Sequence, residues 1–143
     1  MLSPRMITRE FIKECLDILD LKYSELENGA IAISFSEGDA FGHPVMTFVD
    51  IKECRLSFYS RAIDYHPDGD LYAMANRHNC RAYSPACHID LDGDVVMEQA
   101  FYLEHEVSPH YLLENVIRPS LFRPLQAFAA FELTDEEYER HFA

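Results

Sequence analysis

Residues 54–62 constrain the fold most strongly, because their side chains alternate in character at every second position. One set of positions is apolar or small: Cys54, Leu56, Phe58, Ser60 and Ala62. The other set is polar or aromatic: Arg55, Ser57, Tyr59 and Arg61. Because successive side chains of a strand point to opposite faces, this segment predicts a strand with one packed face and one solvated face. Such strands are typical of antiparallel sheets.

Two segments before it also have strand character. Asn28-Gly29 separates residues 22–27 from the apolar run 31–35, and this dipeptide is a strong signal for a two-residue hairpin turn. Residues 45–51 are mostly apolar and predict a buried strand. Together with residues 54–62, these segments predict four consecutive strands.

A second hairpin is predicted by residues 81–91 and 95–103, which are joined across the acidic turn at 92–94. We expect a three-residue loop that pairs Leu91 with Val95. A two-residue loop would place an aspartate opposite Leu91 and break the apolar face.

Helices are predicted on either side of these strands. Thr8 precedes a stripe of 3.6-residue period, which predicts a helix over residues 8–20. An Asp-Gly-Asp sequence at 68–70 begins a shorter helix that ends near Asn79. Ser108-Pro109 has the composition of a third helix start, with a capping hydroxyl followed by proline in the first turn.

The third helix carries a long apolar stripe through two prolines, Pro119 and Pro124. The stripe consists of Leu113, Ile117, Leu121, Leu125, Phe128 and Phe131. Proline inside a helix removes a hydrogen bond and clashes with the preceding turn. Because the stripe stays in phase, we expect a kinked or two-piece helix. Residues 134–143 predict a short acidic helix or tail.

This order of elements predicts an α+β fold, α-ββββ-α-ββ-α, with a curved antiparallel sheet and helices on one face. The length of 143 residues fits a single domain over residues 1–143, with its core at about 7–132.

Charge and composition narrow the possible partners. The formal net charge of -13 disfavours nucleic acid and anionic membranes, because phosphate binding requires clustered Lys and Arg. The first residues show no apolar stretch of a signal peptide, and no later run reaches the ~20 apolar residues of a membrane span. The four cysteines have no Cys-x-x-Cys spacing, so we expect reduced thiols and a cytoplasmic protein.

Metal and catalytic motifs are weak. An EF-hand alignment with Gly93 at position six would put His88 first and Gln99 last, which are the wrong ligands, so residues 88–94 predict a plain hairpin turn. The seven histidines lack zinc-site spacing. We therefore expect no metal, no cofactor and no enzyme. A small hydrolase or metal-dependent enzyme that uses Cys54, His43 and Asp50 remains an alternative.

Residues 76–79, Asn-Arg-His-Asn, end the middle helix and have two interpretations. Asn tolerates the left-handed conformation of a helix C-terminus, and cations suit the helix dipole there. The same side chains could instead form a polar recognition patch.

Three segments together resemble the YbjN-like family, whose members are labelled bacterial sensory transduction regulators. They are the helix end at 71–79, the Asp/Gly turn and strand at 90–96, and the Ser-capped helix start at 107–113. The resemblance covers about residues 7–132. Pro119 and Pro124 depart from the smooth last helix of the family, which puts the geometry or the partner face of this helix in question.

The resemblance implies a fold similar to class I type III secretion chaperones, which are small, acidic, commonly dimeric and bind an extended segment of another protein without chemistry. It therefore implies a non-enzymatic protein-binding or regulatory module of YbjN type, expected as a homodimer. The alternative is a cytoplasmic secretion-type chaperone. Neither reading identifies the partner or client. Candidate contact or motif residues are Asn76, Asn79, Tyr59, Tyr102, Leu121, Phe122 and Phe128.

Overall fold

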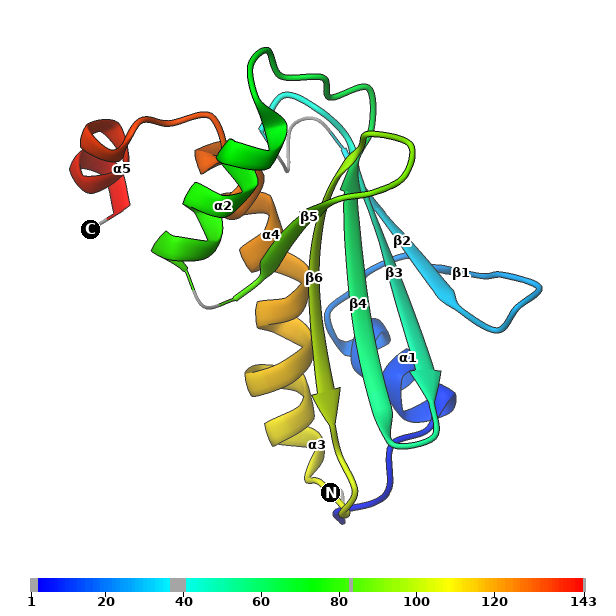
Figure 1. Cartoon of the computed structure of the whole chain (residues 1–143). Coiled ribbons are helices and arrows are strands. Elements are labelled where there is room, and N and C mark those ends of the chain that lie inside the picture. Colours follow the sequence, from blue (N-terminus) through cyan, green and yellow to red (C-terminus); the bar gives the residue numbers. More distant parts are fainter. Residues whose placement is uncertain (1–2, 37–40, 83, 143) are drawn as a thin grey trace.

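The computed structural model describes residues 3–36, 41–82 and 84–142, and within them six strands form one antiparallel sheet. The strands lie in the order β1-β2-β3-β4-β6-β5, and the sheet is open (Figure 1). The strands are β1 (Ser24–Glu25), β2 (Ile31–Phe35), β3 (Val45–Lys52), β4 (Arg55–Ala62), β5 (Ala86–Ile89) and β6 (Val95–Tyr102).

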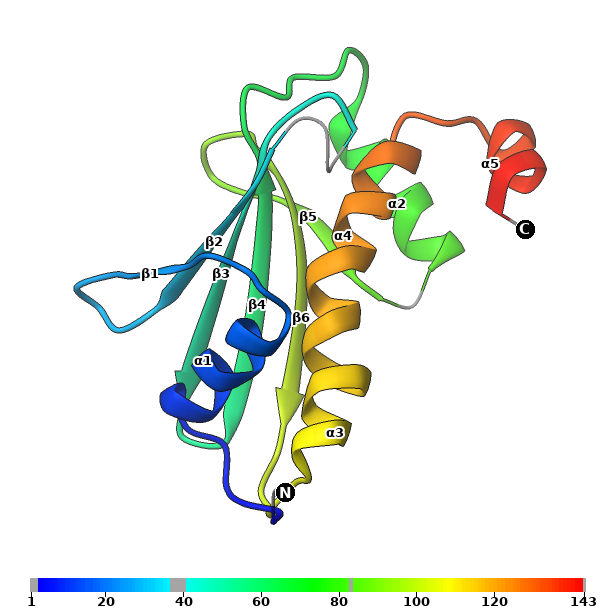
Figure 2. The ribbon, with the colours of Figure 1, turned by 180° about the vertical axis from the view of Figure 1, so that it is seen from behind.

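The helices lie on one side of this sheet and at one edge. The helical elements are α1 (Arg9–Ile18), α2 (Leu71–Arg81), α3 (Pro109–Tyr111), the π-helix η1 (Leu112–Ile117), α4 (Arg118–Ala130) and α5 (Asp135–Phe142). Helices α1 and α4 stand in front of the sheet in Figure 2, and α2 packs beside the edge strand β5. The predicted α+β class and element order are confirmed.

Helix α1 forms where the apolar stripe predicted it. The Thr8 side chain accepts a hydrogen bond from the Phe11 amide at 3.1 Å, which satisfies one of the free donors of the first turn. The helix ends in a Schellman motif, in which the amide of Leu21 donates to the carbonyl of Leu16 and the amide of Asp20 donates to the carbonyl of Asp17. This closure places Asp20 at φ 57°, a left-handed conformation that favours glycine.

Both glycine-containing hairpins close with a three-residue loop. In the first, the amide of Leu26 donates to the carbonyl of Ala30, and Gly29 alone takes a positive φ, 90°. The predicted two-residue turn at Asn28-Gly29 is therefore wrong. The Asn28 side chain instead accepts a bond from the Ala30 amide at 3.0 Å, so the asparagine stabilises the loop without adopting the left-handed conformation.

The second hairpin repeats this pattern and corrects the predicted register. Its loop has three residues as expected, but it closes between Asp90 and Asp94, so that Ile89 rather than Leu91 pairs with Val95. Leu91 lies in the loop and is fully exposed. The physical reason is the position of Gly93, which takes the last place of the loop, where φ is positive. The pairing differs from the prediction by two residues. Because side chains alternate between faces with a period of two, each residue still points to its predicted face.

Helical structure runs without interruption from residue 109 to residue 130 (Figure 1). The turn before Pro119 widens into a π-helix, in which the amide of Arg118 donates to the carbonyl of Leu113, five residues earlier. Proline cannot donate, and its ring needs room beside the preceding turn, so a wider turn accommodates it. Of the two expected forms, kinked or two-piece, the two-piece form is wrong, because the helix is continuous and carries a π turn before Pro119. The extra residue also shifts the stripe, so that Leu112 is fully buried and Leu113 is only partly buried.

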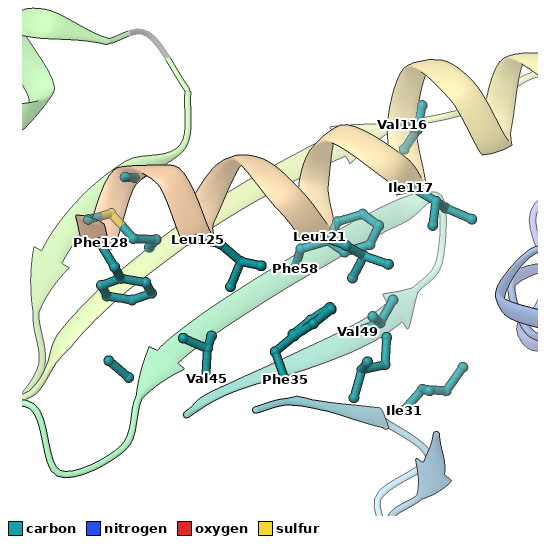
Figure 3. Close-up of a cluster of buried hydrophobic side chains, with 14 of the residues drawn as sticks. Ile31, Phe35, Val45, Val49, Phe58, Val116, Ile117, Leu121, Leu125 and Phe128 are labelled. Atoms are coloured by element: carbon teal, nitrogen blue, oxygen red, sulfur yellow. The ribbon is translucent and has the colours of Figure 1, made fainter. Parts of the chain in front are cut away.

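The core lies between this helix, α1 and the inner face of the sheet. Figure 3 shows Leu121, Leu125 and Phe128 of α4 directed toward Val45 and Phe58 of the sheet. Four of the positions that the sequence assigned to the packed face are buried in the sheet: Leu56, Phe58, Ser60 and Ala62. The fifth, Cys54, is only partly buried, because it lies in the turn before β4 begins. Ser60 is one of the four, and its hydroxyl lies 2.7 Å from that of Thr47 on β3, so this buried polar pair is satisfied.

The helices of the described residues are too short or too polar to cross a lipid bilayer.

Replacement of Asp20 by glycine should stabilise the protein. The left-handed conformation costs a residue with a Cβ about 1–2 kcal/mol, part of which the extra freedom of glycine in the unfolded chain offsets. We expect Asp20→Gly to raise the free energy of unfolding by roughly 0.5–1 kcal/mol in urea denaturation. Asp20→Ala is the matched control, because it removes the same charge but keeps the Cβ. Equal stability of the two variants would contradict this account.

Candidate functional site

None of the helices that the structure describes lies over the sheet face that faces the viewer in Figure 1, and we call this face the open face. At its centre Phe48 of β3 pairs with Tyr59 of β4. Tyr59 is 36% exposed, and Phe48 is half-buried. The flanking outward positions include Met46, which pairs with Arg61, and Ala100, which pairs with Ser57. The Phe48–Tyr59 pair is thus a small aromatic patch, bordered on β6 by Glu98, and we take it as the candidate interaction site of this face.

Sequence reasoning missed Phe48 because it treated residues 45–51 as a strand buried on both faces. In the structure Val45, Thr47 and Val49 are buried, whereas the residues between them are only partly buried. Asp50 was the signal that could have identified the outward set, because a carboxylate rarely lies on a fully buried strand.

The open face carries charges of both signs. Arg61 forms an ion pair with Asp90 at 2.7 Å and lies 4.0 Å from Asp94. His88 of β5 lies 3.2 Å from Glu98 of β6. At the end of the face near the β3–β4 turn, Tyr102 is 72% exposed. The face is therefore apolar at its centre and charged around it, as protein interfaces commonly are.

The predicted partner-contact residues separate into two groups. Tyr59 and Tyr102 lie on the open face, as described above. Leu121 and Phe128 are 0% and 1% exposed and belong to the core, so they are not available to a partner in this structure. Phe122 is 37% exposed and packs edge-on against Phe35. The apolar stripe could not distinguish contact residues from core residues, because both have the same spacing.

Asn79 of the Asn-Arg-His-Asn motif binds the edge strand β5. Its side chain donates to the carbonyl of Cys87 at 3.0 Å and accepts from the amide of Cys87 at 2.8 Å. Beside it, His78 Nε2 lies 2.7 Å from the carbonyl of Pro85. The side-chain amide of Asn79 thus bonds to the backbone of β5 as a neighbouring strand would. This protects the β5 edge from pairing with a strand of another chain. Asn76 is exposed, and no hydrogen bond joins its side chain to the described residues.

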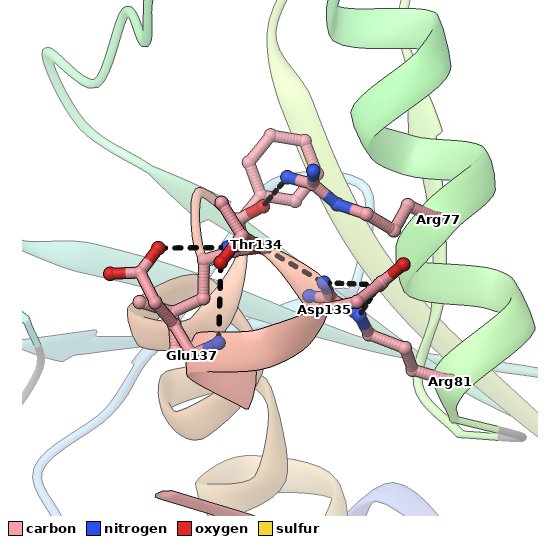
Figure 4. Close-up of polar contacts among 7 residues, drawn as sticks. Arg77, Arg81, Thr134, Asp135 and Glu137 are labelled. Atoms are coloured by element: carbon pink, nitrogen blue, oxygen red, sulfur yellow. Dashed lines mark hydrogen bonds and ion pairs between the residues drawn. The ribbon is translucent and has the colours of Figure 1, made fainter. Parts of the chain in front are cut away.

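The two arginines of α2 hold the C-terminal helix (Figure 4). Arg77 donates to the carbonyl of Phe131, and Arg81 donates to the carbonyl of Leu133 and forms an ion pair with Asp135 at 2.7 Å. The start of α5 is stabilised by reciprocal bonds between Thr134 and Glu137, a capping box. Helix α2 therefore connects the sheet edge to α5.

The structure does not assemble the Cys-His-Asp alternative. His43 precedes β3 and Cys54 follows it, so the eight-residue strand separates them by roughly 25 Å at 3.3 Å per residue. Asp50 lies on the open face, whereas the inner face holds the core. These three side chains therefore form no common site.

The carboxylates of Asp90, Asp92 and Asp94 lie within 4.8 Å of one another at the β5–β6 loop. Hydrogen bonds from the amides of Asp94 and Asp92, together with the nearby Arg61, lower the pKa of Asp90. Its oxygens are thus used by the loop and by Arg61, which agrees with the structural role that the sequence suggests for this turn.

Comparison with known proteins identifies one family. The sequence profile of the YbjN family, described as "Putative bacterial sensory transduction regulator", matches residues 8–117. The match extends from the cap of α1 to the end of η1. No curated protein shows significant similarity to the chain.

Replacement of Asn79 by alanine should destabilise the edge of the sheet. The change removes two hydrogen bonds to Cys87, for which we expect a loss of about 1–3 kcal/mol in the free energy of unfolding, together with faster hydrogen exchange at the Cys87 amide. Asn76→Ala is the matched control, because it makes the same change on the same helix at an exposed position. If both variants lose the same stability, the bonds of Asn79 contribute nothing.

The four thiols should differ in reactivity. Burial raises the pKa of Cys15 to about 11 and that of Cys87 to about 12, so at pH 8 their thiolate fractions are about 0.1% or lower. We expect a thiol reagent such as DTNB to modify Cys80 and Cys54 in the folded protein, and the other two only after unfolding. Cys80→Ser should remove the fastest phase. Rapid modification of all four would contradict this assignment.

Proposed function

Since this chain belongs to the YbjN family, we propose that it is a non-enzymatic regulatory module that acts by binding protein. We further propose that it works as a homodimer in the bacterial cytoplasm, with a second copy of the chain seated on the open face. The observation that carries this proposal is the uncovered Phe48–Tyr59 pair at the centre of the sheet.

The size of the open face supports a second copy as its occupant. From β2 to β5 the face spans five strands of about 4.8 Å each, and each strand contributes about seven residues of 3.3 Å. This corresponds to roughly 550 Å² per copy and about 1,100 Å² for two copies, which lies at the lower end of specific interfaces. A two-fold axis through the centre would place the aromatic pair of one copy on that of the other.

The charge of the face also permits self-association. The chain as a whole carries -13, so two copies repel each other at most surfaces. On the open face, three cationic side chains (Lys52, Arg55 and Arg61) stand against the carboxylates of Asp50 and Glu98 and those of Asp90 and Asp94 beside Arg61, so the charges nearly balance. A face of nearly balanced charge opposes contact with a second copy less strongly than an acidic surface does.

The edge of β2 favours a second candidate function, the binding of an extended client segment. Strand β1 pairs only with Ile31 and Ala32. In the described part of the chain, no strand pairs with residues 33–35 on the side away from β3. Such an edge can accept a strand from another chain through backbone hydrogen bonds. This role is compatible with a dimer, because it uses an edge rather than a face.

Replacement of Tyr59 by lysine should separate the dimer. A buried aromatic anchor contributes about 2 kcal/mol or more to an interface, and a two-fold dimer contains it twice, so we expect the dimer dissociation constant to rise at least a hundredfold. Sedimentation velocity over a concentration series measures it. Tyr72→Lys is the matched control, because Tyr72 is 72% exposed on α2, away from the open face.

Two outcomes would contradict the proposal. A wild-type protein that remains monomeric at several hundred micromolar would exclude the homodimer. A dimer that Tyr59→Lys leaves intact would show that a different surface joins the copies.

A further inference from the structure

A small hollow lies at the end of the open face next to the β3–β4 turn. Its volume is about 290 Å³, and its lining consists of Lys52, Glu53, Arg55 and Tyr102. This volume lies near the lower limit of pockets that hold small molecules. The described residues therefore provide room for one compact group at this place.

The register of the sheet brings the cationic side chains together. Lys52 of β3 pairs with Arg55 of β4, and Arg55 pairs with Tyr102 of β6. The Cβ atoms of directly opposed residues lie about 4.5–5.5 Å apart. Three neighbouring strands thus supply an ammonium, a guanidinium and a phenol in one row, on the same face of the sheet.

Neither cation is neutralised. No carboxylate among the described residues forms an ion pair with Lys52 or Arg55, whereas other cations such as Lys13, Arg61 and Arg81 each pair with one. The Nε atom of Arg55 is buried and has no hydrogen-bond partner within the described ranges. In a chain with 25 acidic and 12 basic residues, these two adjacent cations form no ion pair with any residue that the structure describes, although Glu53 lines the same hollow.

We propose that this hollow binds a phosphate monoester. Arginine presents several donors in a planar fork that matches phosphate oxygens, and lysine adds a second positive charge, so the pair suits a dianion better than a single carboxylate. The Tyr102 ring, 72% exposed, offers a surface on which an aromatic group of the ester can stack. Glu53 lies at the same hollow, and its carboxylate opposes the binding of an anion.

Phenyl phosphate is the probe for this site, measured by amide chemical shifts of the labelled protein at constant ionic strength. We expect shifts at residues 52–55 and 102 with a dissociation constant on the order of 1 mM. Inorganic phosphate should bind more weakly at the same amides, because it lacks the ring. Phenol should not bind at these concentrations.

Two variants that change the charge of the hollow in opposite directions test the proposed site. Lys52→Gln should weaken the binding of phenyl phosphate at least fivefold, and Glu53→Gln should strengthen it severalfold. Arg123→Gln, which removes one positive charge on α4, is the control and should leave the affinity unchanged. Both site variants change exposed side chains at the hairpin end, so the fold is expected to remain intact.

The proposed phosphate site does not depend on the homodimer. The same phenyl phosphate titration of the Tyr59→Lys variant tests the site separately from the dimer. Binding that persists in this variant supports the site whatever the oligomeric state. The proposal is overturned if the shifts are absent up to 20 mM, if they spread over all basic residues, or if Lys52→Gln and Arg123→Gln weaken binding equally.

Discussion

The burial of one sheet face beneath α1 and one long helix is the constraint on which the rest of the structure depends. Residues of α4 such as Leu121 and Phe128 meet Val45 and Phe58 of the sheet, and together they form the centre of the core. Because burial of apolar surface is the dominant favourable term in folding, this contact determines which side of every strand faces inward. It also explains why the helix continues past two prolines. The π turn before Pro119 keeps the helix continuous, and the contact is retained.

With one face used for the core, the other face and the edges determine how the protein can meet other molecules. The β5 edge is protected, because the Asn79 side chain pairs with Cys87 in place of a strand. The β2 edge is covered by β1 only in part. The open face remains, with an aromatic centre and a cationic end at Lys52 and Arg55. A second copy seated over the whole open face would also cover this cationic end, so dimer formation and anion binding there would compete.

The residues after the family match form the end of α4 and the helix α5, and they are held by α2. The YbjN match ends at residue 117, whereas the helix continues to residue 130 and is followed by α5. Two arginines of α2 bind the chain at Phe131, Leu133 and Asp135 (Figure 4). The same helix holds the sheet edge through Asn79. One short helix therefore connects the family-like part of the molecule to the C-terminal segment.

Local patterns in the sequence determined the class of each element, because a period of two or of 3.6 residues depends only on backbone geometry. The alternation at residues 54–62 assigned the packed face of β4 correctly, and Thr8 and Ser108 marked real helix starts. Other features depended on loop geometry, on a wider helical turn or on packing between distant residues. Gly93 and Asp90 set the hairpin register that exposes Leu91, the π turn shifted burial from Leu113 to Leu112, and packing placed Leu121 in the core. The row of Lys52, Arg55 and Tyr102 exists only because β4 lies between β3 and β6. Strand order is a property of the whole fold, and no local pattern encodes it.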